Sequence, residues 1–308
     1  MCLGWEGGRK GQIMRGKLHS RFDYPTLIGV MLLFGVCNAA QTDDEWEAAA
    51  PRRHIEVDLP GHFVQWGLPG TAIGDETINP VDRMEFVWVP ASDFVLGTND
   101  LDPEGKLASA HPFKNIRLSG YWIGKYPVTW NQYNLYCRKQ HLPVPPEPGF
   151  PKTGMHPVVN VNWLQAMSYA RWAHATLPTE FQWEHAARGP RNLNYPWGDV
   201  WDVTKSANSV GHRRNGTSPV GQYAGARSAY GAYDMAGNVT QWCSNWDSKD
   251  YSEVGSVDPQ GPSSGTFRSL RGGGWGGISP ILFRGSFRFH LSPDIRLDIC
   301  GFRCVATF

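Results

Sequence analysis

Four of the six cysteines, those that follow the expected export signal, are the residues of this chain with the most distinctive chemistry, because thiolates bind soft metal ions and paired thiols form disulfides. They are Cys137, Cys243, Cys300 and Cys304. In an oxidising compartment they would be able to form disulfides, and the sequence leaves their connectivity open. The chain has no Cys-x-x-Cys pair and no Cys/His group with zinc spacing, which disfavours a structural zinc site.

Two histidines lie near two glutamates. His174 and His185 flank Glu180 and Glu184, and imidazole with carboxylate is a common set of metal ligands. No third ligand stands at a useful spacing, so we interpret these histidines as surface or helix-packing residues. A Ser/His/Asp triad is defined by geometry, and none can be assembled from sequence order alone.

The last stretch, residues 275–303, contains side chains of the kind that contact a binding partner. Bulky, mostly apolar residues are set between fixed points at Arg284, Arg288, Pro293-Asp294 and Arg296. These inserts are Ile281, Leu282, Phe287, Phe289, His290, Leu291, Ser292, Ile295, Leu297, Asp298 and Ile299. Their spacing fits neither a strand nor a helix. Two interpretations remain open, a filled core and an exposed contact patch.

The composition indicates how these residues are positioned. The chain has 308 residues, of which 41% are hydrophobic and 19% charged, so it is globular and able to bury a sizeable core. Its 14 Trp, 35 Gly and 23 Pro favour many short segments joined by turns. A net charge of +1 without a basic block gives no reason to expect nucleic acid as a partner.

Regular elements are expected from residue 84 onward, after a linker or lead-in over 41–83. Strands are predicted at 85–90 and 94–97 with a turn between them, and a second strand pair at 116–118 and 121–124. Helices are predicted at 130–139 and 163–174 and from Thr179 onward. Their predicted N-caps are Thr129, Asn162 and Thr179.

Residues 1–40 resemble an export signal, with Met14 as a candidate true start. Basic residues at 15, 17 and 21 precede an apolar run at 26–36, and Asn38-Ala39-Ala40 offers small residues for cleavage. The run is too short to span a bilayer comfortably. We therefore expect an exported protein, periplasmic, cell-surface or secreted, with no stable membrane span in its mature form.

Two alternatives concern the same segment. An N-terminal anchor is one of them. A lipoprotein modified at Cys37 is less favoured, because Phe34-Gly35-Val36 differs from the small residues expected before a lipidated cysteine.

Residues 84–306 resemble the formylglycine-generating enzyme family, also called sulfatase-modifying factor domains. The matching strings come in family order: IGKYPVT at 123–129, HPVVNVNW at 156–163, LPTEFQWEHAARG at 177–189, YPWGD at 195–199, YDMAGNVTQW at 233–242, RGGGW at 271–275 and GFR at 301–303. The resemblance implies an α+β fold, a variant of the C-type lectin fold. Such a domain has little regular secondary structure, short antiparallel strands, a few helices and long ordered loops. It also implies that most of the tryptophans pack the core, including Trp183, Trp197, Trp242 and Trp275.

The enzymatic branches of the family depend on ligands that this chain lacks. Catalytic members hold copper through two cysteines just after the Gly-Gly-Ser-Tyr/Trp string, and thiolates suit copper(I). Residues 276–283 here contain no cysteine, so copper is not expected. Iron-dependent sulfoxide synthases add a histidine-rich N-terminal domain, whereas His19, His54 and His62 are scattered.

The resemblance also implies a calcium site. By motif position its ligands would be the side chains of Asp234 and Gln241 and the carbonyls of Gly237 and Val239. Family members usually have Asn and Glu where this chain has Asp234 and Gln241, so one carboxylate is retained. A second family site at Asn208 and Ser209 lacks an Asp to complete it and is not expected.

The closing segment is most similar to the variable proteins of diversity-generating retroelements, which end in a related lectin-like domain. Their last segment is hypermutated at adenines between fixed Arg, Pro-Asp and Gly-Phe-Arg positions, and this chain departs only by one extra residue at the start and by Gly285. Adenine mutagenesis of an Asn codon ending in cytosine yields Phe, Leu, Ile, Ser, His or Asp, but never Lys, Glu, Gln, Met or Trp. Every insert obeys this limit.

The sequence therefore favours an exported, non-catalytic ligand-binding protein. Its segment 275–303 would present a diversified surface to a protein or other macromolecular ligand. The alternative is a formylglycine-generating-type oxidase, or a related enzyme that oxidises small molecules.

Overall fold

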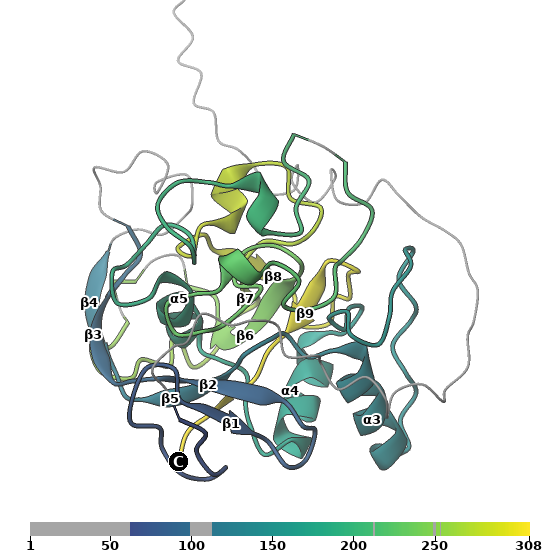
Figure 1. The fold of residues 1–308 in the computed structure, drawn as a ribbon, viewed down its shortest axis with the longest axis horizontal. Coiled ribbons are helices and arrows are strands. Elements are labelled where there is room, and N and C mark those ends of the chain that lie inside the picture. Colours follow the sequence, from purple (N-terminus) through teal and green to yellow (C-terminus); the bar gives the residue numbers. More distant parts are fainter. Residues whose placement is uncertain (1–61, 99–112, 212, 249–250, 253) are drawn as a thin grey trace, which may run out of the picture. The chain divides into compact units, whose positions relative to one another are not determined.

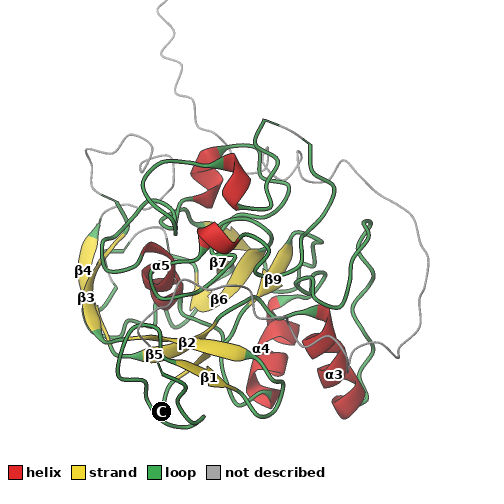
Figure 2. Ribbon diagram, viewed as in Figure 1, coloured by secondary structure: helices red, strands yellow, loops and turns green. Residues whose placement is uncertain are grey.

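The computed structural model of the chain describes residues 62–98, 113–211, 213–248, 251–252 and 254–308 (Figure 1). The expected export signal and the first part of the expected lead-in lie outside these residues. Within them, helices and strands are short and are joined by long loops (Figure 2). This confirms the predicted α+β fold with little regular structure.

Three helices form at the positions predicted from their caps. They are α3 (Trp130–Gln140), α4 (Trp163–Trp172) and α5 (Glu180–Arg188). Each begins with a complete capping box, in which the cap side chain accepts from the N3 backbone N–H while the N3 glutamine reaches back. Helix α4 ends before the predicted residue 174, because His174 adopts the left-handed conformation at φ 53°.

The first sheet has the strand order β1-β2-β5-β10. Its members are β1 (Glu76–Ile78), β2 (Glu85–Val89), β5 (Tyr121–Gly124) and β10 (Val305–Ala306), and all pairs are antiparallel. Strand β1 lies in the segment expected to be a lead-in, so the sheet already begins at residue 76.

The predicted strands exist, but the predicted pairing between them is wrong. Strand β3 (Ser92–Leu96) pairs with β4 (Lys114–Leu118), whereas β2 pairs with β5. The burial patterns explain the exchange. All four residues of β5 and four of the five in β2 are buried, which suits central strands, while β3 and β4 have exposed or half-exposed positions between buried ones and cover the core with one face.

The sheet that carries the closing segment has the order β8-β7-β6-β9. Strand β6 (Thr240–Trp246) lies between β7 (Arg268–Arg271) and β9 (Cys300–Phe302), and β8 (Phe289–Leu291) pairs with the outer side of β7. Residues 272–299 therefore connect β7 to β9, the two strands that flank β6. Because both ends of this segment are held by the same sheet, its loops have fixed starting and end points.

Buried aromatic rings fill the core between these elements. Trp183 and Trp242 are fully buried, and their indole N–H groups donate to Gln241 Oε1 (2.8 Å) and to the Val161 carbonyl (3.0 Å). The core role expected for these two tryptophans is confirmed. Trp197 and Trp275 are only partly buried, so they also reach the surface.

All four cysteines of the described part are buried free thiols. The disulfides allowed by the sequence are therefore not formed among Cys137, Cys243, Cys300 and Cys304. The same described residues contain no helix long and apolar enough to cross a membrane.

Candidate ligand-binding surface

The fixed points of the closing segment are anchored by a buried network of charges. Arg288 is almost completely buried and donates from Nε and Nη2 to the Glu180 carboxylate at 3.0 and 3.1 Å. Arg271 on β7 donates to the same carboxylate at 3.0 Å and to Glu184 at 2.9 Å. Burial raises the pKa of Glu180, but the charges of Arg288 and Arg271 outweigh it and hold this pKa below its usual value. The glutamate is therefore ionised inside the core.

Helix α5 supplies the acidic half of this network. Glu180 and Glu184 are both fully buried, and Glu184 also accepts from Arg188 Nη1 at 2.7 Å. Buried charges are tolerated only when each is paired and hydrogen-bonded. The network therefore fixes the position of Arg288, and with it the centre of the segment, relative to α5 and β7.

Other fixed points are held by hydrogen bonds to neighbouring loops. Arg284 is buried and donates to Asn194 Oδ1 at 2.6 Å. The carbonyl of Pro293 accepts from the N–H of Trp163 at 3.1 Å, and exposed Arg296 donates to Gln165 Oε1 at 2.9 Å. The donor N–H of Trp163 and the acceptor Gln165 Oε1 both lie at the start of α4, so this helix positions the second half of the segment.

Most inserts lie on the outside of this anchored frame. Ile281, Leu282, Phe287, Phe289, His290, Ser292, Leu297 and Asp298 are half-buried, and Ile295 is exposed. In contrast Arg284, Ser286 and Arg288 between them are buried. In the first half of the segment, these three residues thus point inward where the inserts between them reach solvent.

Two inserts belong to the core instead. Leu291 and Ile299 are 7% and 6% exposed and pack in the main hydrophobic cluster. A Cβ added at Gly274 would lie 2.2 Å from Ile299 Cγ1, so the Ile299 side chain occupies the space next to this glycine. Burial at these two positions fits the core interpretation of the inserts and leaves little of either side chain for a ligand.

Two residues outside the segment extend its surface around His290. Asp247, just after β6, lies 3.2 Å from His290 Nδ1 through Oδ2 and accepts from Arg288 through Oδ1 at 3.1 Å. The ring of Phe267, which is 41% exposed, lies 4.9 Å from the imidazole. Sequence reasoning missed both residues, because the pairing of β6 with β7 and of β7 with β8 brings them beside His290.

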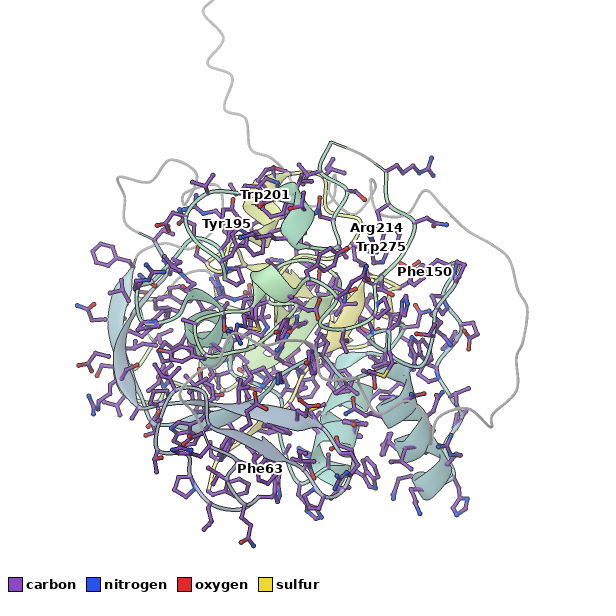
Figure 3. The ribbon with its side chains drawn as sticks, in the orientation of Figure 1. Phe63, Phe150, Tyr195, Trp201, Arg214 and Trp275 are labelled. Carbon is purple, nitrogen blue, oxygen red and sulfur yellow. The ribbon has the colours of Figure 1, made fainter. Side chains whose placement is uncertain are left out.

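An aromatic cluster borders the other end of the surface. Ile281 and Leu282 lie on a short 3-10 helix, η3 (Pro280–Phe283), and Phe283 stacks on Trp201 at 4.9 Å. Tyr195 lies 5.3 Å from Trp201, and Figure 3 shows the two at the same end of the described region. A cavity of about 630 Å³ opens there, lined by residues 197–203 and Lys205. Farther along, Trp275 packs edge-to-face on Phe150 at 5.4 Å.

The predicted calcium ligands are engaged in hydrogen bonds with the protein. Gln241 Oε1 accepts from Trp183 Nε1 at 2.8 Å and from Arg303 Nε at 2.6 Å, and Gln241 Nε2 donates to the Asp234 carbonyl at 2.7 Å. If the Gln241 amide were reversed, its NH2 group would face the N–H donors of Trp183 and Arg303, so these partners fix its orientation. Both lone pairs of the amide oxygen are thereby used.

The carboxylate of Asp234 has protein partners as well. It accepts from the backbone N–H of Gly221 at 2.8 Å and from Asn238 Nδ2 at 3.2 Å. The predicted set of Asp234, Gly237, Val239 and Gln241 therefore does not fit calcium in this arrangement, because Gln241 has no free lone pair for the cation and the guanidinium of Arg303 lies against it.

The thiols of the described residues are buried. Burial raises the pKa of Cys137, Cys243, Cys300 and Cys304 above the ordinary thiol value, so each is protonated at neutral pH. No group of three or more His, Cys, Asp or Glu side chains is placed to hold a metal ion among the described residues. His185 is buried and contacts the hydroxyls of Ser92 and Tyr230 at 2.9 Å, which agrees with its interpretation as a helix-packing residue.

These features define the class of the protein: a loop-rich α+β domain with the formylglycine-generating-enzyme type of fold. The model of the sulfatase-modifying factor enzyme 1-like domain matches residues 74–308. The chain belongs to this family.

Two relatives are similar to this chain over most of its length. The chain is 34% identical over 256 residues to the serine/threonine-protein kinase Pkn1 of Chlamydia trachomatis, covering 74% of this chain and 39% of that protein. It is 37% identical over 285 residues to the formylglycine-generating enzyme of Thermomonospora curvata, covering 71% of this chain and 92% of the enzyme. The chain thus spans less than two thirds of the kinase's own length.

Two solved structures share the fold. PvdO from Pseudomonas aeruginosa superposes with a TM-score of 0.69 at 25% identity, covering 77% of this chain and 99% of PvdO. The Treponema denticola variable protein 1 superposes with a TM-score of 0.62 at 23% identity, covering 75% and 98%. At this identity the second likeness concerns the fold alone.

Proposed function

We propose that this domain is a non-catalytic ligand-binding module that presents the inserts of segment 275–303 to a protein or other macromolecule. One observation carries the proposal. The frame residues Arg284 and Arg288 are buried and hydrogen-bonded, whereas all inserts except Leu291 and Ile299 reach solvent. Such a division lets surface residues change while the residues that fix the backbone stay.

The exposed inserts are of the kind that gives affinity. Phe287, Phe289 and Leu297 are large apolar side chains on a backbone already fixed at both ends, so binding would order few additional groups. His290 and Asp298 add polar selectivity. Burial raises the pKa of the Asp298 carboxyl, so a partner that supplies a donor or a cation would be favoured there.

Export is part of the same proposal and is supported by the sequence of residues 14–40. A protein that displays a diversified face to macromolecules outside the cell has to leave the cytoplasm. Processing would be visible as a mature N-terminus near Ala40 in the exported fraction.

The alternative is an oxidase of the formylglycine-generating type, supported by the 37% identity to such an enzyme. Against it stands the sequence of residues 276–283, which has no cysteine where catalytic relatives have their copper ligands. Each cysteine of the described region is a buried thiol with a raised pKa. Protein loaded with copper(I) should therefore leave a sulfatase-type cysteine peptide unchanged, and turnover with stoichiometric copper would establish the enzyme instead.

The coding sequence offers the first test of the binding proposal. A near-copy of the segment encoding residues 275–303, differing mainly at adenines, should lie close to a reverse transcriptase gene. Absence of both would contradict the proposal that the segment is diversified, but it would not contradict the proposal of a binding surface with a fixed sequence.

The second test is binding itself. Full-length protein should retain a macromolecular ligand from its natural surroundings, and Phe289→Ser with Leu297→Ser should reduce retention at least about tenfold, since each removes a large apolar anchor. Phe63→Ser with Leu68→Ser is the matched control, because both residues are exposed and Phe63 lies far from Trp275 and Trp201 (Figure 3). Equal loss in both pairs would contradict a specific surface.

A further inference from the structure

Arg268 is a cation held in an unusual position at the edge of the insert surface. Its guanidinium lies between two indole rings, 3.6 Å from the centroid of Trp163 and 3.4 Å from that of Trp246. The one hydrogen bond of the guanidinium to the described residues runs from Nη1 to the carbonyl of Ser244 at 2.7 Å. Nε is buried without an acceptor.

No carboxylate compensates this charge among the described residues. Arg271, Arg288 and Arg188 are each paired with buried acids, but Arg268 forms no ion pair. Burial lowers its pKa to about 10, with no opposing charge to raise it. A partly desolvated and unpaired guanidinium gains more from an incoming anion than a fully hydrated one does.

The two indoles decide how an anion can approach. The rings lie against the faces of the guanidinium and Nε is buried, so only the edge formed by Nη1 and Nη2 remains for a ligand, with one N–H of Nη1 already bonded to the Ser244 carbonyl. That edge fits the two oxygens of a carboxylate, which accept parallel hydrogen bonds from a guanidinium. Stacking also holds the group in place before binding, so little side-chain entropy remains to be lost.

Arg268 lies next to the inserts. It is opposite Leu291 in the β7–β8 register, and the N–H of Trp163, one of its two indole neighbours, is bonded to the carbonyl of Pro293. On the other side, Phe267 contacts His290. The unpaired cation thus adjoins the face proposed to bind a macromolecule.

We propose that Arg268 is a specificity-determining residue of this surface and binds a carboxylate of a protein partner through the in-plane N–H groups of its guanidinium. This rests on the proposed function for the identity of the partner as a macromolecule. It adds that the partner carries an Asp or Glu side chain, or a chain-terminal carboxylate, beside the apolar patch that meets Phe289 and Leu297.

The experiment uses acetate as the probe and needs no identified partner. Full-length 15N-labelled protein is titrated with sodium acetate at constant ionic strength, and the indole N–H signals of Trp163 and Trp246 are followed by NMR. Acetamide, which is neutral and of the same shape, serves as the control ligand. Saturable shifts of these signals with acetate and none with acetamide are expected.

Variants of Arg268 distinguish the effect of the guanidinium's paired N–H groups from the effect of its positive charge. Arg268→Lys keeps the charge and should bind acetate about tenfold more weakly, because one or more charge-assisted hydrogen bonds are lost. Arg268→Met should abolish the saturable shift, while Arg171→Met on the exposed side of α4 should leave it unchanged. Dispersed signals from the unligated variant establish that it is folded.

The outcomes distinguish this inference from the proposed function. Acetate binding that is absent, or equal in Arg268→Lys and the parent protein, overturns the role of Arg268 whether or not a macromolecular ligand is found. Acetate binding that requires Arg268 supports it even if Phe289→Ser with Leu297→Ser fails to affect ligand retention, in which case the proposed function alone falls.

Discussion

Replacing Arg288 by methionine tests whether the frame of the closing segment is structural. Methionine has a similar stem and no charge, so the change removes the guanidinium while filling much of its volume. Two hydrogen bonds to Glu180 at 3.0 and 3.1 Å and one to Asp247 at 3.1 Å are lost. Glu180 would keep only Arg271 as its cationic partner.

The expected cost follows from the burial of both partners. Removing one member of a buried ion pair leaves an uncompensated charge and destabilises a protein by about 3–5 kcal/mol. Stabilities of native domains are about 5–15 kcal/mol, so the variant would be severely weakened. For a domain of this size, the loss corresponds to a fall in Tm of roughly 6–20 °C.

Urea denaturation followed by tryptophan fluorescence measures this loss. Ile295→Ser is the control within the same segment, because Ile295 is exposed and should change the free energy of unfolding by less than about 0.5 kcal/mol. Adding Glu180→Gln to Arg288→Met should recover part of the stability, since the uncompensated negative charge is removed. If Arg288→Met costs no more than Ile295→Ser, the division into buried frame and exposed inserts is refuted.

Three further predictions concern other parts of the domain. Burial lowers the pKa of His185 to about 4 from 6.5, so the unfolded chain binds more protons between these values. Urea titrations should show stability falling as pH drops from 6.5 to 4, with His185 contributing at most about 1.4 kcal/mol per pH unit and His156, whose pKa burial also lowers to about 4, adding to the slope. A shallower slope in His185→Gln would confirm the share of His185. Millimolar calcium should leave the Tm of the parent protein unchanged. The variant Gln241→Glu loses the hydrogen bond to the Asp234 carbonyl, so its Tm should be lower and should depend on calcium. A calcium-dependent Tm in the parent protein would contradict the hydrogen-bonded arrangement. Leu291→Ser should cost about 2–4 kcal/mol by chemical denaturation because Leu291 is a core residue, and a cost close to that of Ile295→Ser would return it to the exposed inserts.

The helices could be predicted from the sequence because their signals are local. Thr129, Asn162 and Thr179 each cap a helix with a glutamine three residues later, and the capping box needs only those four residues. Strand pairing was not accessible in this way. Whether β2 pairs with β3 or β5 depends on which strands are buried on both faces, and this is decided by elements far away in the sequence.

The candidate surface was only partly predictable for the same reason. The alternation of arginines and inserts pointed to a frame, but the sequence did not show that Leu291 and Ile299 turn inward. Nor did it show that Arg303 lies against Gln241 and takes one of the lone pairs that a cation would need. Motif position singled out Gln241, but the chemistry of its amide depends on Arg303, which lies between β9 and β10.

The buried charges explain why a face of this kind tolerates replacement of its inserts. Apolar packing alone would hold the segment through the same side chains that vary, so each replacement would also alter the fold. Here Arg271 and Arg288 bind acids supplied by α5, and α5 lies outside the segment. The backbone of the segment is therefore positioned largely by contacts made outside the inserts. Buried Leu291 and Ile299 tie the choice of insert most directly to the stability of the domain, and the half-buried Leu282, Phe289 and Leu297 do so in part, because they pack against the hydrophobic clusters. A set of natural variants should accordingly keep apolar residues at positions 291 and 299, while the exposed position 295 differs freely in polarity.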